Sequence, residues 1–178
     1  MKKIASILLL LVLLLGLVAC AEESDVPTNM QNVAAENAKF NLYVPLSWTS
    51  YADSGVSGGV APTEDKANVT VTATLAETMN LTPAQYWESK CLPEYKAEHS
   101  PLAEFHMVDA ECGDTTLGGK DAKRYVFTYR MDGQFYKVMQ IITVADDVVY
   151  TMTFTTKDTA FGNYNETVEQ IRSAFSFR

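Results

Sequence analysis

The sequence is poor in the residues that most often carry metal or covalent chemistry, with only three cysteines and two histidines among 178 residues. Positive charge is also scarce, because 14 Lys and Arg stand against 22 Asp and Glu, which gives a formal net charge of −8. Nucleic acids are bound mainly by neutralising their phosphates with basic side chains. This chain is acidic, and it has no basic run outside the N-terminal segment that contains Lys2 and Lys3. We therefore do not expect it to bind nucleic acid.

Long hydrophobic runs are absent except at the N-terminus. Lys2 and Lys3 precede an apolar stretch from Ile4 to Val18. A helix of about fifteen residues spans roughly 22 Å, which is less than the roughly 30 Å hydrocarbon core of a bilayer. The pattern predicts an export signal over residues 1–19 instead of a permanent transmembrane helix.

The end of this run, Leu17-Val18-Ala19-Cys20, resembles the bacterial lipoprotein signal known as the lipobox. The resemblance implies that the chain is cut before Cys20 and that a diacylglycerol is joined to the Cys20 thiol. Two acyl chains anchor a protein stably, whereas a single chain is marginal. We therefore expect an extracytoplasmic protein anchored to a bacterial membrane; an ordinary secretory signal with an uninvolved Cys20 is the alternative.

The remainder of the chain predicts a spacer and a single domain. Residues 20–38 comprise the lipidated cysteine and then small, polar and acidic residues without periodicity, which favours a flexible spacer reaching roughly 20 to 25 Å. The whole chain is 47% hydrophobic and 20% charged, which is typical of a globular protein. We predict one globular domain over residues 39–178.

Alternating apolar and polar residues predict the strands of this domain. Strands are expected over 40–44, 69–75, 105–112, 123–131, 134–144 and 148–156. The last three are separated by Asp132-Gly133 and Ala145-Asp146-Asp147, which are turn sequences of antiparallel hairpins. In the strand 69–75 the residues Val69, Val71, Ala73 and Leu75 are expected to face the core.

Two helices complete the predicted fold. Thr82, Pro83 and Gln85 form a capping sequence with proline at the first helical position. Apolar residues from Tyr164 to Phe175 recur at helical spacing, which predicts a C-terminal helix lying on the sheet. The predicted fold class is α+β, a central antiparallel sheet of about six to seven strands flanked by helices.

Four segments of the domain carry a resemblance to a known family. They are 40–45 with Trp48, 118–122 leading into 125–129, 149–155, and 171–177. Together they resemble the PsbP-like superfamily, which includes photosystem II accessory proteins, nuclear-import Mog proteins and many bacterial envelope lipoproteins. The resemblance implies an α/β/α sandwich and a non-enzymatic assembly or binding role. No functional residue of the photosynthetic or nuclear members can be matched in this sequence.

Lipidation of Cys20 leaves Cys91 and Cys112 as a pair in an oxidising or surface-exposed compartment. A disulfide between them is the simplest prediction. It closes a loop of about 22 residues and contributes roughly 3 kcal/mol in the chain-entropy description. Two buried free thiols, or a redox or metal pair that lacks CxxC spacing, are the alternatives.

Two other patterns bear on catalysis or metal binding. Residues 55–59 have the GxSxG spelling of a hydrolase nucleophile at Ser57, but no helix follows, so a glycine-rich hairpin loop is favoured. His99 and His106 stand near several carboxylates and could hold a divalent metal, although their spacing fits one face of neither a helix nor a strand. We predict no catalytic, cofactor or metal residue, and keep a metal-handling lipoprotein and a serine hydrolase as alternatives.

Polar side chains are expected to share one face of the sheet. They are Thr70, Thr72 and Thr74 with Thr151, Thr153 and Thr155. Such a face binds a partner or is simply solvated. The favoured function is a lipid-anchored extracytoplasmic binding or accessory protein, non-enzymatic and without a cofactor, that presents its domain to an envelope protein or a small ligand.

Overall fold

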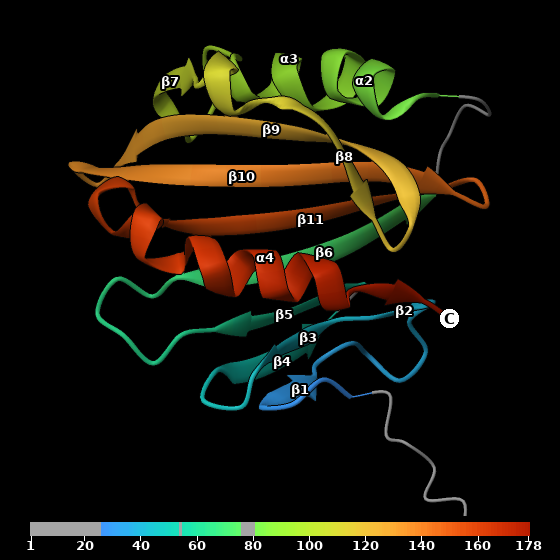
Figure 1. Cartoon of the computed structure of the whole chain (residues 1–178). Helices are drawn as coiled ribbons and strands as arrows, with labels where there is room; N and C mark the ends of the chain where they lie inside the picture. The colour runs from blue at the N-terminus through green and yellow to red at the C-terminus, as the bar shows by residue number, and fades with distance from the viewer. Residues whose placement is uncertain (1–25, 54, 76–80) are drawn as a thin grey trace, which may run out of the picture.

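An antiparallel sheet of eight strands organises the domain, as the computed structural model shows for residues 26–53, 55–75 and 81–178 (Figure 1). The strand order is β4-β5-β6-β11-β10-β9-β7, with β8 paired to β9. The strands are β4 (Thr49–Asp53), β5 (Val56–Val60), β6 (Asn68–Leu75), β7 (Ala103–Met107), β8 (Gly113–Leu117), β9 (Lys120–Met131), β10 (Gln134–Ala145) and β11 (Val148–Lys157). The predicted α+β class is confirmed, with one strand more than expected.

Both faces of the sheet are covered around β10. Ile141 and Ile142 are both fully buried, although successive strand residues point to opposite faces. Ile141 shares one hydrophobic core with Ile171 of helix α4 (Asn165–Ala174). Ile142 belongs to a second core, together with Trp87. The sheet therefore separates two apolar layers, as the predicted sandwich requires.

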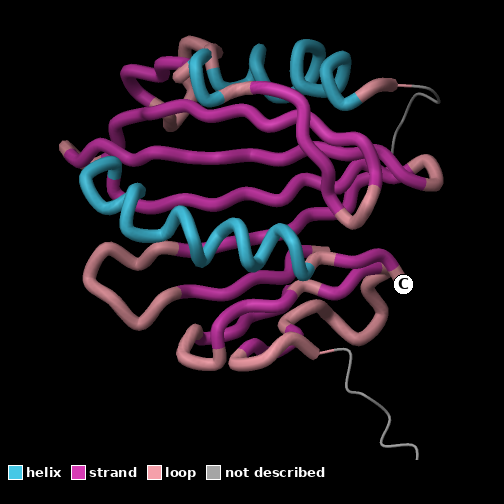
Figure 2. Tube along the Cα trace, in the orientation of Figure 1, coloured by secondary structure: helices cyan, strands magenta, loops and turns pink. Residues whose placement is uncertain are grey.

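Helices cover the two faces at the places that the sequence predicts (Figure 2). One helical segment comprises α2 (Pro83–Tyr86), a π-helical turn η1 (Trp87–Cys91) and α3 (Leu92–Tyr95). The capping box is confirmed, because the Gln85 N–H donates to Thr82 Oγ1 and the Thr82 N–H donates to Gln85 Oε1. A 3-10 segment η3 (Asp158–Tyr164) leads into α4. Among the described residues, no helix is long and apolar enough to cross a bilayer.

Two small sheets lie next to the main one. β1 (Met30–Asn32) pairs with β3 (Tyr43–Pro45), and β2 (Phe40–Asn41) pairs with β12 (Ser176–Phe177). The predicted strand 40–44 is thus divided at Leu42, whose N–H bonds to Asn32 Oδ1. The predicted spacer also ends earlier than residue 38, because Met30 is buried and β1 is hydrogen-bonded into the domain.

The C-terminal residue is bonded to the same N-terminal region. The Arg178 guanidinium donates to the carbonyl oxygens of Ala35, Glu36 and Ala38 at 3.1 to 3.3 Å. Its backbone N–H donates to the Lys39 carbonyl at 2.9 Å. These bonds, with the β2–β12 pairing, join the two ends of the described chain.

Three predicted segments differ from the structure. The strand expected over 105–112 ends at Met107, and the chain then forms a 3-10 turn, η2 (Asp109–Glu111). The loop expected over 55–59 is mostly the strand β5. Ala73 and Leu75, both expected in the core, are exposed, Leu75 to 76%, because the end of β6 borders an open hollow beside Val148.

The hairpin turns of the central strands are confirmed. Asp132 and Gly133 have φ values of 51° and 79°, and Asp146 and Asp147 have values of 50° and 60°. Positive φ at both turn residues is the geometry of the type I′ hairpin, for which Asp and Gly are suited. Asp146-Asp147 is therefore a turn at the end of a hairpin.

Gly58 shows why a glycine occupies a strand interior in β5. A Cβ added to Gly58 would lie 2.5 Å from the Val69 carbonyl oxygen and 2.8 Å from the ring of Tyr51. The side chain of Tyr51, opposite Gly58 in the register, thus fills the space that a side chain at position 58 would take.

We predict that Gly58→Ala lowers the free energy of unfolding by about 1–3 kcal/mol, because the added methyl group must displace the β6 backbone or the Tyr51 ring. Gly113→Ala is the matched control, since its Cβ has no atom within 4 Å. Urea denaturation of both variants measures the difference. Equal stability of the two variants would contradict the packing described at Gly58.

Candidate functional site

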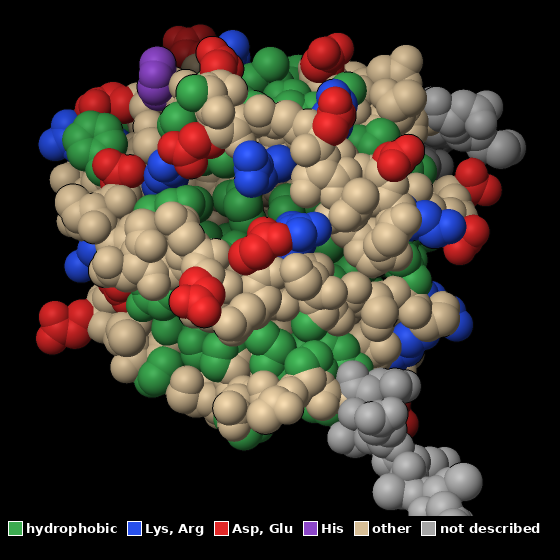
Figure 3. Space-filling model, viewed as in Figure 1, with side chains coloured by type: hydrophobic (Ala, Val, Ile, Leu, Met, Phe, Trp, Pro, Cys, Tyr) green, Lys and Arg blue, Asp and Glu red, His purple; other side chains and the backbone are tan. Residues whose placement is uncertain are grey.

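A cleft of about 360 Å³ opens between α4 and the strands β9 and β10. Figure 3 views this face, on which charged side chains of both signs surround exposed hydrophobic ones. Val126, Met139, Phe161 and Val168 supply the apolar surface of the cleft, and its polar lining residues are Glu111, Arg124, Asn165 and Glu169. We treat this cleft as the candidate functional site.

The apolar surface of the cleft comes from the sheet on one side and from η3 and α4 on the other. Val126 of β9 and Met139 of β10 are register partners, so their side chains lie on the same face of the sheet. Phe161 of η3 and Val168 of α4 face them, and both are buried. The cleft thus lies at the border of the core that joins α4 to the sheet.

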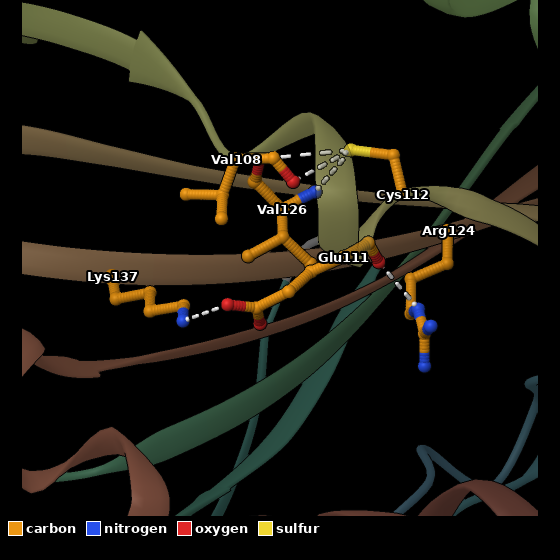
Figure 4. Close-up of polar contacts among 6 residues, drawn as sticks. All are labelled: Val108, Glu111, Cys112, Arg124, Val126 and Lys137. Atoms are coloured by element: carbon orange, nitrogen blue, oxygen red, sulfur yellow. Dashed lines mark hydrogen bonds and ion pairs between the residues drawn. The ribbon is translucent and has the colours of Figure 1, made fainter.

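Glu111 and Lys137 form an ion pair next to the cleft (Figure 4), with Lys137 Nζ 2.6 Å from Glu111 Oε1. The ammonium group also lies 4.7 Å from the centre of the Phe161 ring, a cation–π arrangement. The Lys137 side chain is only 16% exposed, and these two contacts hold its ammonium group in place. Glu111 is positioned by η2, whose last turn bonds its N–H to the Val108 carbonyl.

A second ion pair, between Glu169 and Arg172, lies along α4. Hydrogen bonds from Arg172 lower the pKa of the Glu169 carboxyl, and the charge of Arg124 lowers it further. Arg172 also donates from Nη1 to the Thr116 carbonyl of β8 at 2.8 Å. Glu169 is therefore ionised and already bonded at neutral pH.

Arg124 is the cation of the cleft that has no carboxylate partner. Its Nε donates to the Glu111 carbonyl oxygen at 2.9 Å (Figure 4). Among the described residues, no carboxylate forms an ion pair with it, and its two terminal nitrogens make no hydrogen bond. The site therefore combines two carboxylates, each paired with a cation, and one guanidinium whose two terminal nitrogens can still donate hydrogen bonds to a ligand.

The disulfide predicted between Cys91 and Cys112 is not formed in the structure, where both are free thiols. Cys112 Sγ lies 3.5 Å from the Val108 carbonyl oxygen and accepts the Val126 N–H at 3.3 Å (Figure 4). Cys91 lies in η1, within the core that contains Trp87. The two sulfurs thus have separate surroundings, a backbone turn and an aromatic core.

The structure separates the residues of the hydrolase alternative. Ser57 is 2% exposed in the middle of β5, and its Oγ accepts the Ala35 N–H at 3.0 Å. His106 lies in β7, five strand spacings from β5 in the sheet order, which is about 24 Å. Ser57 therefore has neither the exposed turn nor the histidine that a serine nucleophile requires.

The two histidines of the metal alternative are both exposed. His99 lies in the turn after α3, and His106 lies on β7. Within the described ranges, no group of three or more His, Cys, Asp or Glu side chains could hold a metal ion. The structure gives the metal alternative no support.

The threonine face is formed as predicted. Thr72 lies opposite Thr151, and Thr70 lies opposite Thr153, on the face of the sheet away from α4. Thr153 Oγ1 accepts a hydrogen bond from Gln140, which also bonds to the Tyr95 hydroxyl. Hydrogen bonds through Gln140 of β10 thus connect this face of the sheet to α3.

Sequence reasoning did not find the cleft. Arg124 and Lys137 lie within predicted strands, and Glu111 is one of the several carboxylates near the two histidines. The one available signal is a charged residue on the same face of the sheet as a buried one, because Arg124, whose side chain is exposed, pairs in register with fully buried Ile141.

These features define a domain of the PsbP/Mog1-like fold, which the resemblance implied. Solved structures of the same fold were found, whereas no protein-family model and no curated protein matches the chain by sequence.

Three solved structures illustrate the likeness. Cyanobacterial PsbP from Synechocystis sp. PCC 6803 matches with a TM-score of 0.61 and 11% identity over 85% of this chain and 94% of that one. The Ran-binding protein Mog1p of Saccharomyces cerevisiae matches at 0.58 and 8%, over 84% and 95%. LpqN of Mycobacterium tuberculosis, described as involved in cell envelope biogenesis, matches at 0.55 and 16%, over 83% and 89%. At these identities the likeness shows the fold alone.

A longer protein contains the same fold. A Bacteroides thetaiotaomicron protein matches with a TM-score of 0.53 and 14% identity, and this chain spans 45% of its length.

We predict that Cys91 resists alkylation in the native protein. Burial, together with the nearby charge of Glu94, raises the pKa of its thiol from 9.0 to about 11, so its thiolate fraction at pH 8 falls about 100-fold. Iodoacetamide at pH 8 followed by peptide mass spectrometry should therefore modify Cys112 faster than Cys91.

Unfolding in guanidinium without a reductant provides the control. Both cysteines should then react fully, because neither is held in a disulfide. A mass two hydrogens lower, with both residues protected until a reductant is added, would contradict the free thiols seen here.

Proposed function

We propose that this chain is a lipid-anchored extracytoplasmic binding protein that serves an envelope partner or ligand and has no catalytic activity of its own. The observation that carries the proposal is the cleft between α4 and the sheet, where part of the core is open beside an unpartnered guanidinium. Apolar surface beside a few placed polar groups is the usual composition of a binding site.

The polar groups of the cleft favour binding over catalysis. Glu111 is bonded to Lys137 and Glu169 to Arg172, so each carboxylate already has a cationic partner. A general acid or base needs a pKa near the working pH, and the pKa of Glu169 is shifted the other way. Such a site recognises charge and shape without transferring protons.

The proposed location rests on the sequence of the N-terminus, with a cationic start, an apolar run and Ala19 before Cys20. It agrees with the description of LpqN, a protein of the same fold involved in cell envelope biogenesis. Mog1p, a further protein of this fold, is described as Ran-binding, and that description supports a role with a protein partner.

We predict that Cys20→Ala abolishes membrane anchoring through lipid. Without the thiol no diacylglycerol can be attached, so the variant should keep its signal segment and lack the acyl mass. Intact mass spectrometry of protein from the membrane fraction distinguishes the two forms, with Cys91→Ala as a control that should be processed normally. A wild-type protein of unlipidated mass would refute the anchor and leave the domain's binding role to a separate test.

That separate test uses photo-cross-linking in intact cells. A photoreactive residue replaces Asn165, which is exposed at the cleft, or in a matched control Thr74, which is exposed on the opposite face. We expect a discrete adduct from position 165 that position 74 does not give. Identical adduct patterns from the two positions, or none from position 165, would contradict a binding role for the cleft.

A further inference from the structure

The charged residues of the cleft, taken together with the two cations that pair with its carboxylates, carry one more positive than negative charge. Glu111 is paired with Lys137, and Glu169 is paired with Arg172. This leaves Arg124, the third cation of the group, without an ion pair among the described residues. In a chain of net charge −8, a local excess of one positive charge selects for an anion at this position.

The way Arg124 is held sets the geometry of that anion. The bond from Nε to the Glu111 carbonyl fixes one side of the guanidinium and leaves its two terminal nitrogens as parallel donors. A planar carboxylate matches two parallel donors and accepts both bonds. A dianionic phosphate would bring a second negative charge close to Glu169, whose pKa already responds to Arg124.

The remaining surface of the cleft determines the polarity and the size of the rest of the ligand. Val126, Met139, Phe161 and Val168 offer only carbon and sulfur side-chain atoms to the space beside Arg124. Val126, Phe161 and Val168 are at most 8% exposed and Met139 is more open, so an aliphatic body would gain mainly by covering Met139, whereas polyol hydroxyls placed against these atoms would stay unbonded. At roughly 30 Å³ for each water-sized group, 360 Å³ holds about a dozen non-hydrogen atoms.

We infer that the cleft binds a small amphiphilic carboxylate, with its carboxylate on the terminal nitrogens of Arg124 and its aliphatic body on Met139 and Phe161. The inference rests on the proposed binding function and names the class of ligand for the same site. Aliphatic acids and the C-terminal carboxylates of apolar peptides share this chemistry.

The test uses hexanoate as the probe and the full chain in nanodiscs of neutral phospholipid. Binding is followed by NMR of 13C-labelled methionine methyl groups, in which the Met139 signal is assigned from Met139→Leu. The control is Arg124→Met, which keeps an unbranched apolar stem and removes the guanidinium. Partition of hexanoate into lipid is the same for both proteins, so the difference between them reports the site.

We expect saturable displacement of the Met139 signal by hexanoate, and at least tenfold weaker binding of the neutral isostere hexanamide. Arg124→Met should weaken hexanoate at least tenfold, which is 1.4 kcal/mol, and remove the preference over hexanamide. Glu169→Gln should tighten hexanoate, because it removes a negative charge next to Arg124 while the domain stays folded.

Equal binding of hexanoate and hexanamide, or an Arg124→Met variant that still prefers hexanoate, would overturn the inference. So would a Met139 signal that hexanoate does not move. None of these results bears on the photo-cross-linking from position 165, so the proposed binding function stands or falls separately. N-acetyl-leucine, which imitates a peptide C-terminus, distinguishes the two sources, since the tighter of the two carboxylates identifies the one that fits.

Discussion

Strand β10 is hydrogen-bonded on both edges and buried on both faces, and the other elements pack against it or its neighbours. It pairs with β9 from Gln134 to Thr143 and with β11 from Tyr136 to Ala145. Ile141 and Ile142 face opposite cores, and burial of each contributes about 1.5–3 kcal/mol. Because both sides of β10 are apolar, the fold needs one helical layer for each, and α4 and the α2–α3 segment supply them.

The cleft is a consequence of this arrangement. Helix α4 approaches the sheet closely at Ile171, which is fully buried, while Val168 and Phe161 lie next to open space. On the sheet side, Val126 of β9 and Met139 of β10 line the opening, and Met139 is the more exposed of the two. Of the charged residues around them, Glu111 pairs with Lys137 and Glu169 with Arg172, so these charges are compensated at the border of the core, while Arg124 has no carboxylate partner there.

Local signals allowed much of the fold to be predicted from the sequence. The hairpin turns at Asp132-Gly133 and Asp146-Asp147 and the capping box at Thr82 depend on residues close together in the chain. Strand β5 was missed because Gly58 looks like a loop residue until the Tyr51 ring over it is known. Strand β1 was missed for a similar reason, since only its pairing with β3 makes Met30 a core residue.

The site was less predictable than the fold, because its parts come from separate elements. Glu111, Arg124, Lys137 and Glu169 lie on η2, β9, β10 and α4 and share no spacing that a motif could capture. The disulfide prediction had the same limit. An even number of cysteines does not show where their side chains point. The structure places Cys112 against the β9 backbone and Cys91 in the aromatic core.

The bonds between Arg178 and the carbonyl groups of Ala35, Glu36 and Ala38 have a mechanical consequence. A pull on the N-terminal end of the domain first loads β1, which is held by only three residue pairs to β3. The next resistance is the Arg178 guanidinium and the β2–β12 pairing, which carry the load directly to the C-terminal strand. Part of the tension therefore passes directly from the N-terminal segment to the C-terminal strand, and part reaches β5, near the edge of the sheet, through the bond between Ala35 and Ser57, while the strands β9 and β10 that line the cleft lie away from both paths.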